Sequence, residues 1–180
     1  MSTGTVSTGR RTQPIRRATT AATLAVTALA LSACGANTLQ DRSKPTITLD
    51  QARTRIDGYL AGIQAQLPVQ PASLPPAFSD LECDANDIGP HGRKQTSRSY
   101  TYPDLPLADR TKAADAFRGY LTGQGFQAVP DAAGSHPGWV RLKNSTDEFL
   151  AVLDGATDPS RSFRLTVSSP CVWPDGTPAK

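Results

Sequence analysis

The sequence predicts an α+β domain built as a two-layer sandwich, with two helices on one face of a mostly antiparallel sheet of four to six strands. Two stretches, residues 48–67 and 108–122, carry apolar residues at helical spacing. Short strand-like runs lie between and after them, and the last three are joined by short connectors rich in turn-forming residues. Because such connectors suit hairpins, we expect the final strands to run antiparallel.

The first helix has the clearest pattern. Thr48 can cap its N-terminus, and the Gln51 side chain can return the hydrogen bond, which is a capping-box arrangement. Pro68 ends the helix, and the Pro-rich stretch 68–76 predicts an extended connection. The apolar residues recur every three or four positions and form one stripe for burial: Leu49, Ala52, Ile56, Tyr59, Leu60, Ile63 and Leu67.

The second helix is predicted from about Ala108 to Thr122, with Asp109 as a candidate cap and Gly123 or Gly125 as the stop. Its apolar side is formed by Ala113, Ala114, Phe117, Tyr120 and Leu121.

The predicted strands are short. Residues 86–94 hold two glycines and a proline, which indicates a loop. The run 148–153 is nearly all apolar, which predicts a central strand buried on both faces. The full set of predicted strands is 81–83, 98–102, 126–129, 139–143, 148–153 and 162–167.

The first 33 residues have the features of an export signal. Residues 1–17 are polar and basic, and residues 18–31 are all apolar or Thr. These 14 residues are too few for a membrane-spanning helix, which needs about 20. Two arginine pairs leave open whether export uses the general or the twin-arginine route: Arg10, Arg11, Arg16 and Arg17.

The segment Leu31-Ser32-Ala33-Cys34-Gly35 resembles the bacterial lipobox. The resemblance implies that the Cys34 thiol receives a diacylglycerol and that the chain is cut just before it. Two acyl chains make a stable attachment, where a single chain is marginal. The alternatives are an ordinary signal that happens to end near a cysteine, or an uncleaved amphipathic helix, which the basic-then-apolar order argues against. Residues 34–44 would then be a tether, and residues 45–180 one domain outside the plasma membrane.

The formal net charge of +3 comes from the leader. Four of the 19 basic residues and none of the 16 acidic residues precede Cys34, so the remainder is close to neutral. A nearly neutral domain gives no electrostatic case for binding nucleic acid.

Export would place the domain in an oxidising compartment, where Cys83 and Cys171 are the two remaining thiols and can form one disulfide. The alternative is two free, buried cysteines. We predict no metal site, because two cysteines and two distant histidines, His91 and His136, lack ligand spacing.

No catalytic residue and no cofactor is predicted. Both histidines lie in loops beside Gly and Pro, and neither a nucleophile elbow nor a phosphate-binding glycine loop is present in the sequence. The aromatics Tyr100, Tyr102 and Trp139 are candidates for a ligand or partner surface. The alternative is that they pack beneath the helices. For Trp173, next to the second cysteine of the pair, we expect a structural role such as covering the disulfide.

Four short motifs together resemble small actinobacterial cell-envelope lipoproteins of the LppA-like kind, over most of residues 45–174. They are the lipobox, Cys83 after the first helix, the strand start at 124–129 and the closing segment 168–174. The resemblance implies a lipid-anchored protein with a helix-on-sheet domain. This family has no established activity, so no catalytic residue is carried over.

We therefore expect a non-enzymatic, lipid-anchored binding or scaffolding domain, with an envelope protein or a glycan as its partner. One alternative is a carrier of lipid or glycan, which requires an apolar cavity between sheet and helices. Another is a small envelope hydrolase, which requires His91 or His136 beside a Ser hydroxyl or an acid.

Overall fold

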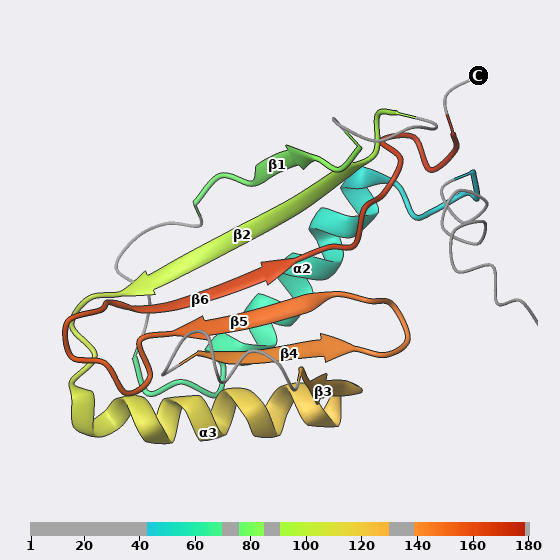
Figure 1. Ribbon diagram of the computed structural model, residues 1–180. Coiled ribbons are helices and arrows are strands. Elements are labelled where there is room, and N and C mark those ends of the chain that lie inside the picture. The colour runs from blue at the N-terminus through green and yellow to red at the C-terminus, as the bar shows by residue number, and fades with distance from the viewer. Residues whose placement is uncertain (1–42, 70–75, 85–90, 130–138, 179–180) are drawn as a thin grey trace, which may run out of the picture. The chain divides into compact units, whose positions relative to one another are not determined.

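The computed structural model describes residues 43–69, 76–84, 91–129 and 139–178, all within one compact unit that spans Cys34–Lys180. They form two helices and a six-stranded antiparallel sheet, which confirms the predicted α+β class (Figure 1). The elements are α2 (Leu49–Gln64), β1 (Ser79–Glu82), β2 (Lys94–Tyr102), α3 (Leu107–Gly123), β3 (Phe126–Ala128), β4 (Val140–Asn144), β5 (Leu150–Asp154) and β6 (Phe163–Ser168).

The last strand lies in the middle of the sheet. The spatial order is β1-β2-β6-β5-β4-β3, and every neighbouring pair is antiparallel. Leu165 of β6 therefore lies opposite Tyr100 of β2 on one side and Leu153 of β5 on the other. As a result, β6 joins the β1–β2 hairpin to the β3–β4–β5 half of the sheet.

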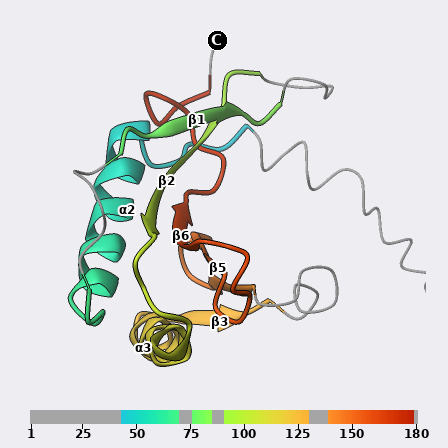
Figure 2. The same cartoon turned by 90° about the vertical axis from the view of Figure 1, so that its left-hand side faces the viewer.

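Both helices pack on the same face of the sheet, as Figure 2 shows in side view. Helix α2 contacts β2 and β6, while α3 contacts β3 and β4, and the two helices also contact each other. Gly62 makes the helix contact close, because a Cβ added there would lie 1.8 Å from the Tyr120 hydroxyl.

The hydrophobic core lies between the helices and this face. Alternate residues of each long strand point into it, as the period of two requires. Its largest side chains are less than 2 % exposed, which leaves the core well filled. The buried residues include Ile56, Leu60 and Ile63 of α2, Phe117 and Leu121 of α3, and Phe126, Leu153, Phe163 and Leu165 of the sheet.

The helix boundaries differ from the predictions in two places. The capping box of Thr48 and Gln51 is confirmed, but α2 ends at Gln64 rather than Leu67. Its last turn tightens, because the Leu67 amide bonds the Gln64 carbonyl three residues back, although Leu67 itself stays buried. Asp109 is not the cap of α3. Pro106 is, without a side-chain bond, and Asp109 lies inside the first turn, where its charge suits the helix dipole.

Two strand predictions were also wrong in part. Strand β2 begins at Lys94, inside the predicted loop, because its polar first residues pair with β1. Strand β5 is central as predicted, but it is not buried on both faces. Ala151 and Leu153 are buried and Val152 is only half-buried, since the described helices cover one face of the sheet.

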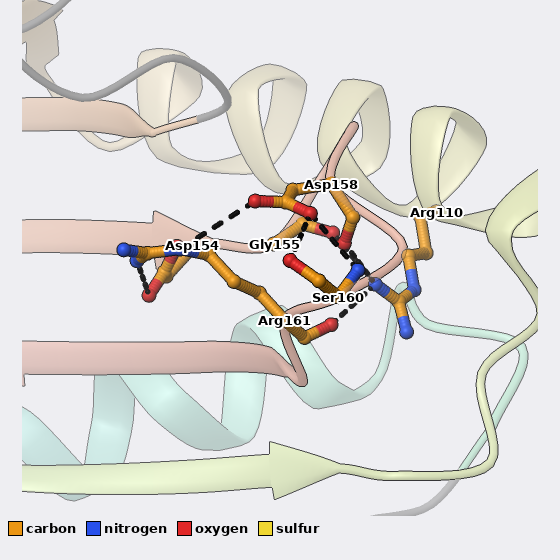
Figure 3. A network of polar contacts seen from close by, with 6 residues as sticks. All are labelled: Arg110, Asp154, Gly155, Asp158, Ser160 and Arg161. Carbon is orange, nitrogen blue, oxygen red and sulfur yellow. Dashed lines mark hydrogen bonds and ion pairs between the residues drawn. The ribbon is translucent and has the colours of Figure 1, made fainter.

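A buried arginine holds one end of the domain together. Arg110 of α3 is 7 % exposed, and its Nε donates to the Leu105 carbonyl at 3.1 Å. Its Nη1 donates to three carbonyls of the β5–β6 connection, those of Gly155 at 3.0 Å, Asp158 at 3.0 Å and Arg161 at 2.7 Å (Figure 3). The guanidinium thereby fixes this connection against the start of α3.

Replacing Arg110 with Ala should lower the free energy of unfolding by about 2–4 kcal/mol, because several buried carbonyls lose their donor. Urea denaturation would measure the loss. Arg118→Ala is the matched control on the same helix, since that exposed side chain forms a surface ion pair with Asp115, and it should cost less than about 1 kcal/mol. Equal losses in the two variants would contradict this role for Arg110.

Candidate functional site

The predicted disulfide is present, linking Cys83 after β1 to Cys171 after β6, with Cα atoms 6.1 Å apart. Beside it, Lys94 and Val172 exchange two backbone hydrogen bonds of 2.8 and 2.9 Å. The disulfide and these bonds attach the C-terminal tail to the β1–β2 hairpin.

The same tail holds the start of the domain. The Thr46 amide bonds the Gly176 carbonyl at 2.8 Å, and the Leu49 amide bonds the Pro174 carbonyl at 3.1 Å. Trp173 is 1 % exposed, and its indole N–H donates to the Lys44 carbonyl at 3.2 Å. Trp173 thus has a structural role, as expected, and the chain enters the domain at a fixed point beside the tail.

Two of the three aromatics considered as candidates for a binding surface are in the core. Tyr100 and Tyr102 are 7 % and 1 % exposed, and the Tyr102 ring meets Phe163 edge-on at 5.9 Å. Both occupy positions of β2 that face the helices, so the packing alternative holds for them. Burial raises the pKa of Tyr102 to about 12. Trp139, just before β4, is half-buried.

The opposite face of the sheet is not covered by either described helix. On β2 and β6 it carries small hydroxyl side chains, of which Ser99 and Thr166 lie 2.8 Å apart. On β4 and β5 it carries charged and aliphatic side chains instead. By register, its residues are Ser97, Ser99 and Thr101 of β2, Arg164, Thr166 and Ser168 of β6, Leu150 and Val152 of β5, and Arg141 and Lys143 of β4.

Two adjoining hollows of about 330 and 320 Å³ lie on this side of the sheet. They share Val129, Lys143 and Glu148, so we treat them as one, the open-face groove. One part is also lined by Gln127, Ala128, Asn144 and Ser145, and the other by Gln95, Arg141, Leu150, Ser169, Pro170 and Cys171. A groove of this size can hold a small ligand.

Of the two basic side chains that line this groove, one has an acidic partner among the described residues and the other has none. Lys143 forms an ion pair with Glu148 at 2.9 Å. Arg141 is half-buried, and its Nε is shielded from solvent without an acceptor among the described residues. A guanidinium has five donors, and a buried donor left without a partner costs about 1–3 kcal/mol. Sequence reasoning missed Arg141, because nothing in the sequence marks which arginine of a strand lacks a partner.

The rim of the groove is fixed by a polar cluster between α2 and the β4–β5 turn. The Tyr59 hydroxyl donates to Asp147 Oδ2 at 2.8 Å, and Arg55 contacts the same oxygen at 3.4 Å. The pKa of Tyr59 is raised above its ordinary range. Burial is the largest cause, and the hydrogen bond to Asp147 is the second. Because Tyr59 also packs edge-on against Phe126 at 5.0 Å, the turn that carries Glu148 is held in place.

The residues that a hydrolase would need are not brought together in the described part of the chain. His91 Nδ1 lies 2.7 Å from the backbone carbonyl of Asp84, and no contact with a Ser hydroxyl or a carboxylate is described for it. His136 and Cys34 lie outside the described residues. Within the described ranges, no group of three His, Cys, Asp or Glu side chains could hold a metal ion.

Comparison with protein-family models, curated proteins and solved structures found no match for this chain. Neither described helix combines the length and apolar character needed to cross a membrane.

The disulfide should be the largest single contribution to stability. It closes a loop of 88 residues, and the chain-entropy model gives such a crosslink about 4–5 kcal/mol. The double variant Cys83→Ser/Cys171→Ser should lose this amount in urea denaturation. Reduction of the unaltered protein should give the same loss, and a loss below about 1 kcal/mol in both experiments would contradict the prediction.

Stability should also fall at alkaline pH. Tyr102 ionises near 12 when folded and near its ordinary value of 10.0 when unfolded. The raised pKa means that neutral Tyr102 favours the folded state. Its full contribution to the free energy of unfolding is therefore present below pH 10 and is lost as the pH rises toward 12, as linkage requires. Tyr102→Phe should flatten this fall in urea denaturation between pH 9 and 11, with a constant offset from the unaltered protein between pH 6 and 8. Parallel curves over the whole range would refute this.

Proposed function

We propose that this chain is an exported lipoprotein of the bacterial cell envelope. A diacylglycerol on Cys34 would hold it at the outer side of the plasma membrane, and its domain would bind or scaffold an envelope component without catalysing a reaction. The basic leader, the apolar segment and the lipobox support this proposal, as does the resemblance to LppA-like envelope lipoproteins.

One observation carries the proposal further than the leader alone. The disulfide uses Cys83 and Cys171, and disulfides persist in exported proteins rather than in the bacterial cytosol. Cys34 is then the one remaining thiol, and it stands directly after the apolar segment, where a lipidated cysteine belongs.

The part of the domain where the chain enters, beside the C-terminal tail, suits an anchored protein. Residues 34–44 span at most about 3.5 Å each, so the domain would lie within roughly 40 Å of the membrane surface. Lys44 is held to Trp173, and the tail is held by the disulfide. The disulfide end of the domain would therefore face the membrane, and a pull on the tether would be borne by a crosslinked part of the fold.

No specific observation favours the two alternatives. A carrier would need an apolar cavity between sheet and helices, whereas the large side chains of that layer pack together with less than 2 % exposure. The hollows described above lie on outer surfaces instead. A hydrolase would need a nucleophile or acid beside a histidine, and the described partner of His91 is a backbone carbonyl.

Cys34→Ala tests the anchor. The full chain and the variant would be expressed in a bacterial host, separated into membrane and soluble fractions, and their N-termini examined by mass spectrometry. We expect the unaltered protein to be membrane-bound and to begin at a diacylglyceryl-modified Cys34, whereas the variant should leave the membrane fraction or stay uncleaved.

The control is the double variant Cys83→Ser/Cys171→Ser, which lacks the disulfide but keeps the lipobox and should stay membrane-bound. If Cys34→Ala is still cut at the same bond and still fractionates with membranes, the proposal fails.

A further inference from the structure

The open-face groove contains an arginine that nothing in the described fold uses. Arg141 lines the groove, yet no ion pair or hydrogen bond of its guanidinium is found among the described residues. Most of the other described arginines have an acid beside them, such as Arg53 with Asp80 and Arg98 with Asp57. A half-buried guanidinium that lines a groove and has no acid beside it among the described residues is a candidate site for an anion.

The surroundings select the kind of anion. Glu148 lines both parts of the groove and would repel a second negative charge. Lys143 is already paired with Glu148, so one cation remains for the ligand. A single planar guanidinium matches the two oxygens of a carboxylate, whereas a phosphate dianion would bring more charge than the groove compensates.

The rest of the groove suits a peptide. Val129, Leu150 and Pro170 offer apolar walls, and Gln127 adds an amide side chain that can bond a peptide backbone. Among the described residues that line the groove there is no aromatic ring, which a sugar would use as a stacking surface. The observations therefore favour a peptide carboxylate over a sugar acid.

We propose that the open-face groove binds a short peptide through a free carboxylate, which Arg141 receives in a two-point hydrogen bond. The remaining peptide residues lie along Val129 and Leu150 toward the Lys143–Glu148 pair. This inference rests on the proposed function, since it names the ligand class of the binding domain.

The test uses the full chain, purified in detergent with its disulfide intact, and isothermal titration calorimetry. The probes are N-acetyl-Ala-Ala, the same dipeptide as its C-terminal amide, glucuronate and inorganic phosphate. N-acetyl-Ala-Ala should bind, and the amide, glucuronate and phosphate should each bind at least about tenfold more weakly, because the carboxylate supplies the charge-assisted bonds and the peptide the other contacts.

Arg141→Gln should weaken binding of N-acetyl-Ala-Ala about tenfold or more. Arg164→Gln is the matched control: Arg164 is an exposed arginine on the same face, outside the groove, and it also has no ion pair among the described residues. That variant should bind within about twofold of the unaltered protein at 0.15 M salt, where exposed charges are screened. Arg141→Lys keeps the charge but not the planar fork, and should fall between Arg141→Gln and the unaltered protein. It replaces Arg141→Gln if that variant unfolds.

Three results would overturn the proposal: no binding of N-acetyl-Ala-Ala, equal losses in the Arg141 and Arg164 variants, or glucuronate or phosphate binding as tightly as the dipeptide. Binding is measured on purified protein from whichever cell fraction contains it. A failure of the lipid anchor would therefore be seen separately from a failure of the groove.

Discussion

The pairing of β6 with both β2 and β5 is the constraint on which the other features of this domain depend. The last strand of the chain closes the sheet, so the β1–β2 hairpin and the β3–β4–β5 half are joined through it. Such a sheet needs long-range contacts, and loop closure makes them slow and costly to form. The tail after β6 adds covalent and backbone bonds to the β1–β2 hairpin, which holds the central strand in register at its C-terminal end.

This arrangement also decides which surface is left for binding. The helices α2 and α3 bury one face of the sheet, and the polar clusters of Arg110 and of Tyr59 with Asp147 fix connections at its ends. The other face keeps short hydroxyl side chains on β2 and β6, and it carries the open-face groove, which extends from β3 and β4 to Gln95 of β2. A rigid sheet with held turns is a suitable frame for a recognition site, because little order must be gained when a ligand binds.

The proposed anchor and the proposed ligand site are linked by the tail. Cys171 and its neighbours Ser169 and Pro170 form one wall of the groove, and two residues later Trp173 holds the start of the domain. A peptide in the groove would thus lie near the end of the domain that the tether joins. Envelope peptides are accessible to a protein held there, which connects the ligand class to the proposed location.

The local features of the domain could be predicted from the order of the amino acids. Periodicity was enough to locate both helices, and a capping box to place the start of α2, because side-chain spacing and end capping act within a few residues. The alternation in residues 162–167 predicted the strand β6. The pairing of Cys83 with Cys171 was predicted from export and from the assignment of Cys34 to the lipid, which leaves two thiols.

The features that depend on strand order and register became visible in the folded domain. Tyr100 and Tyr102 alternate with polar residues in the sequence, but which face of β2 they occupy follows from where the helices pack. Nothing in the sequence distinguishes the roles of Arg110 and Arg141. The fold places backbone carbonyls around Arg110 and no described partner beside Arg141. The physical reason is that burial and pairing arise from contacts between segments far apart in the chain, and no short stretch of sequence encodes them.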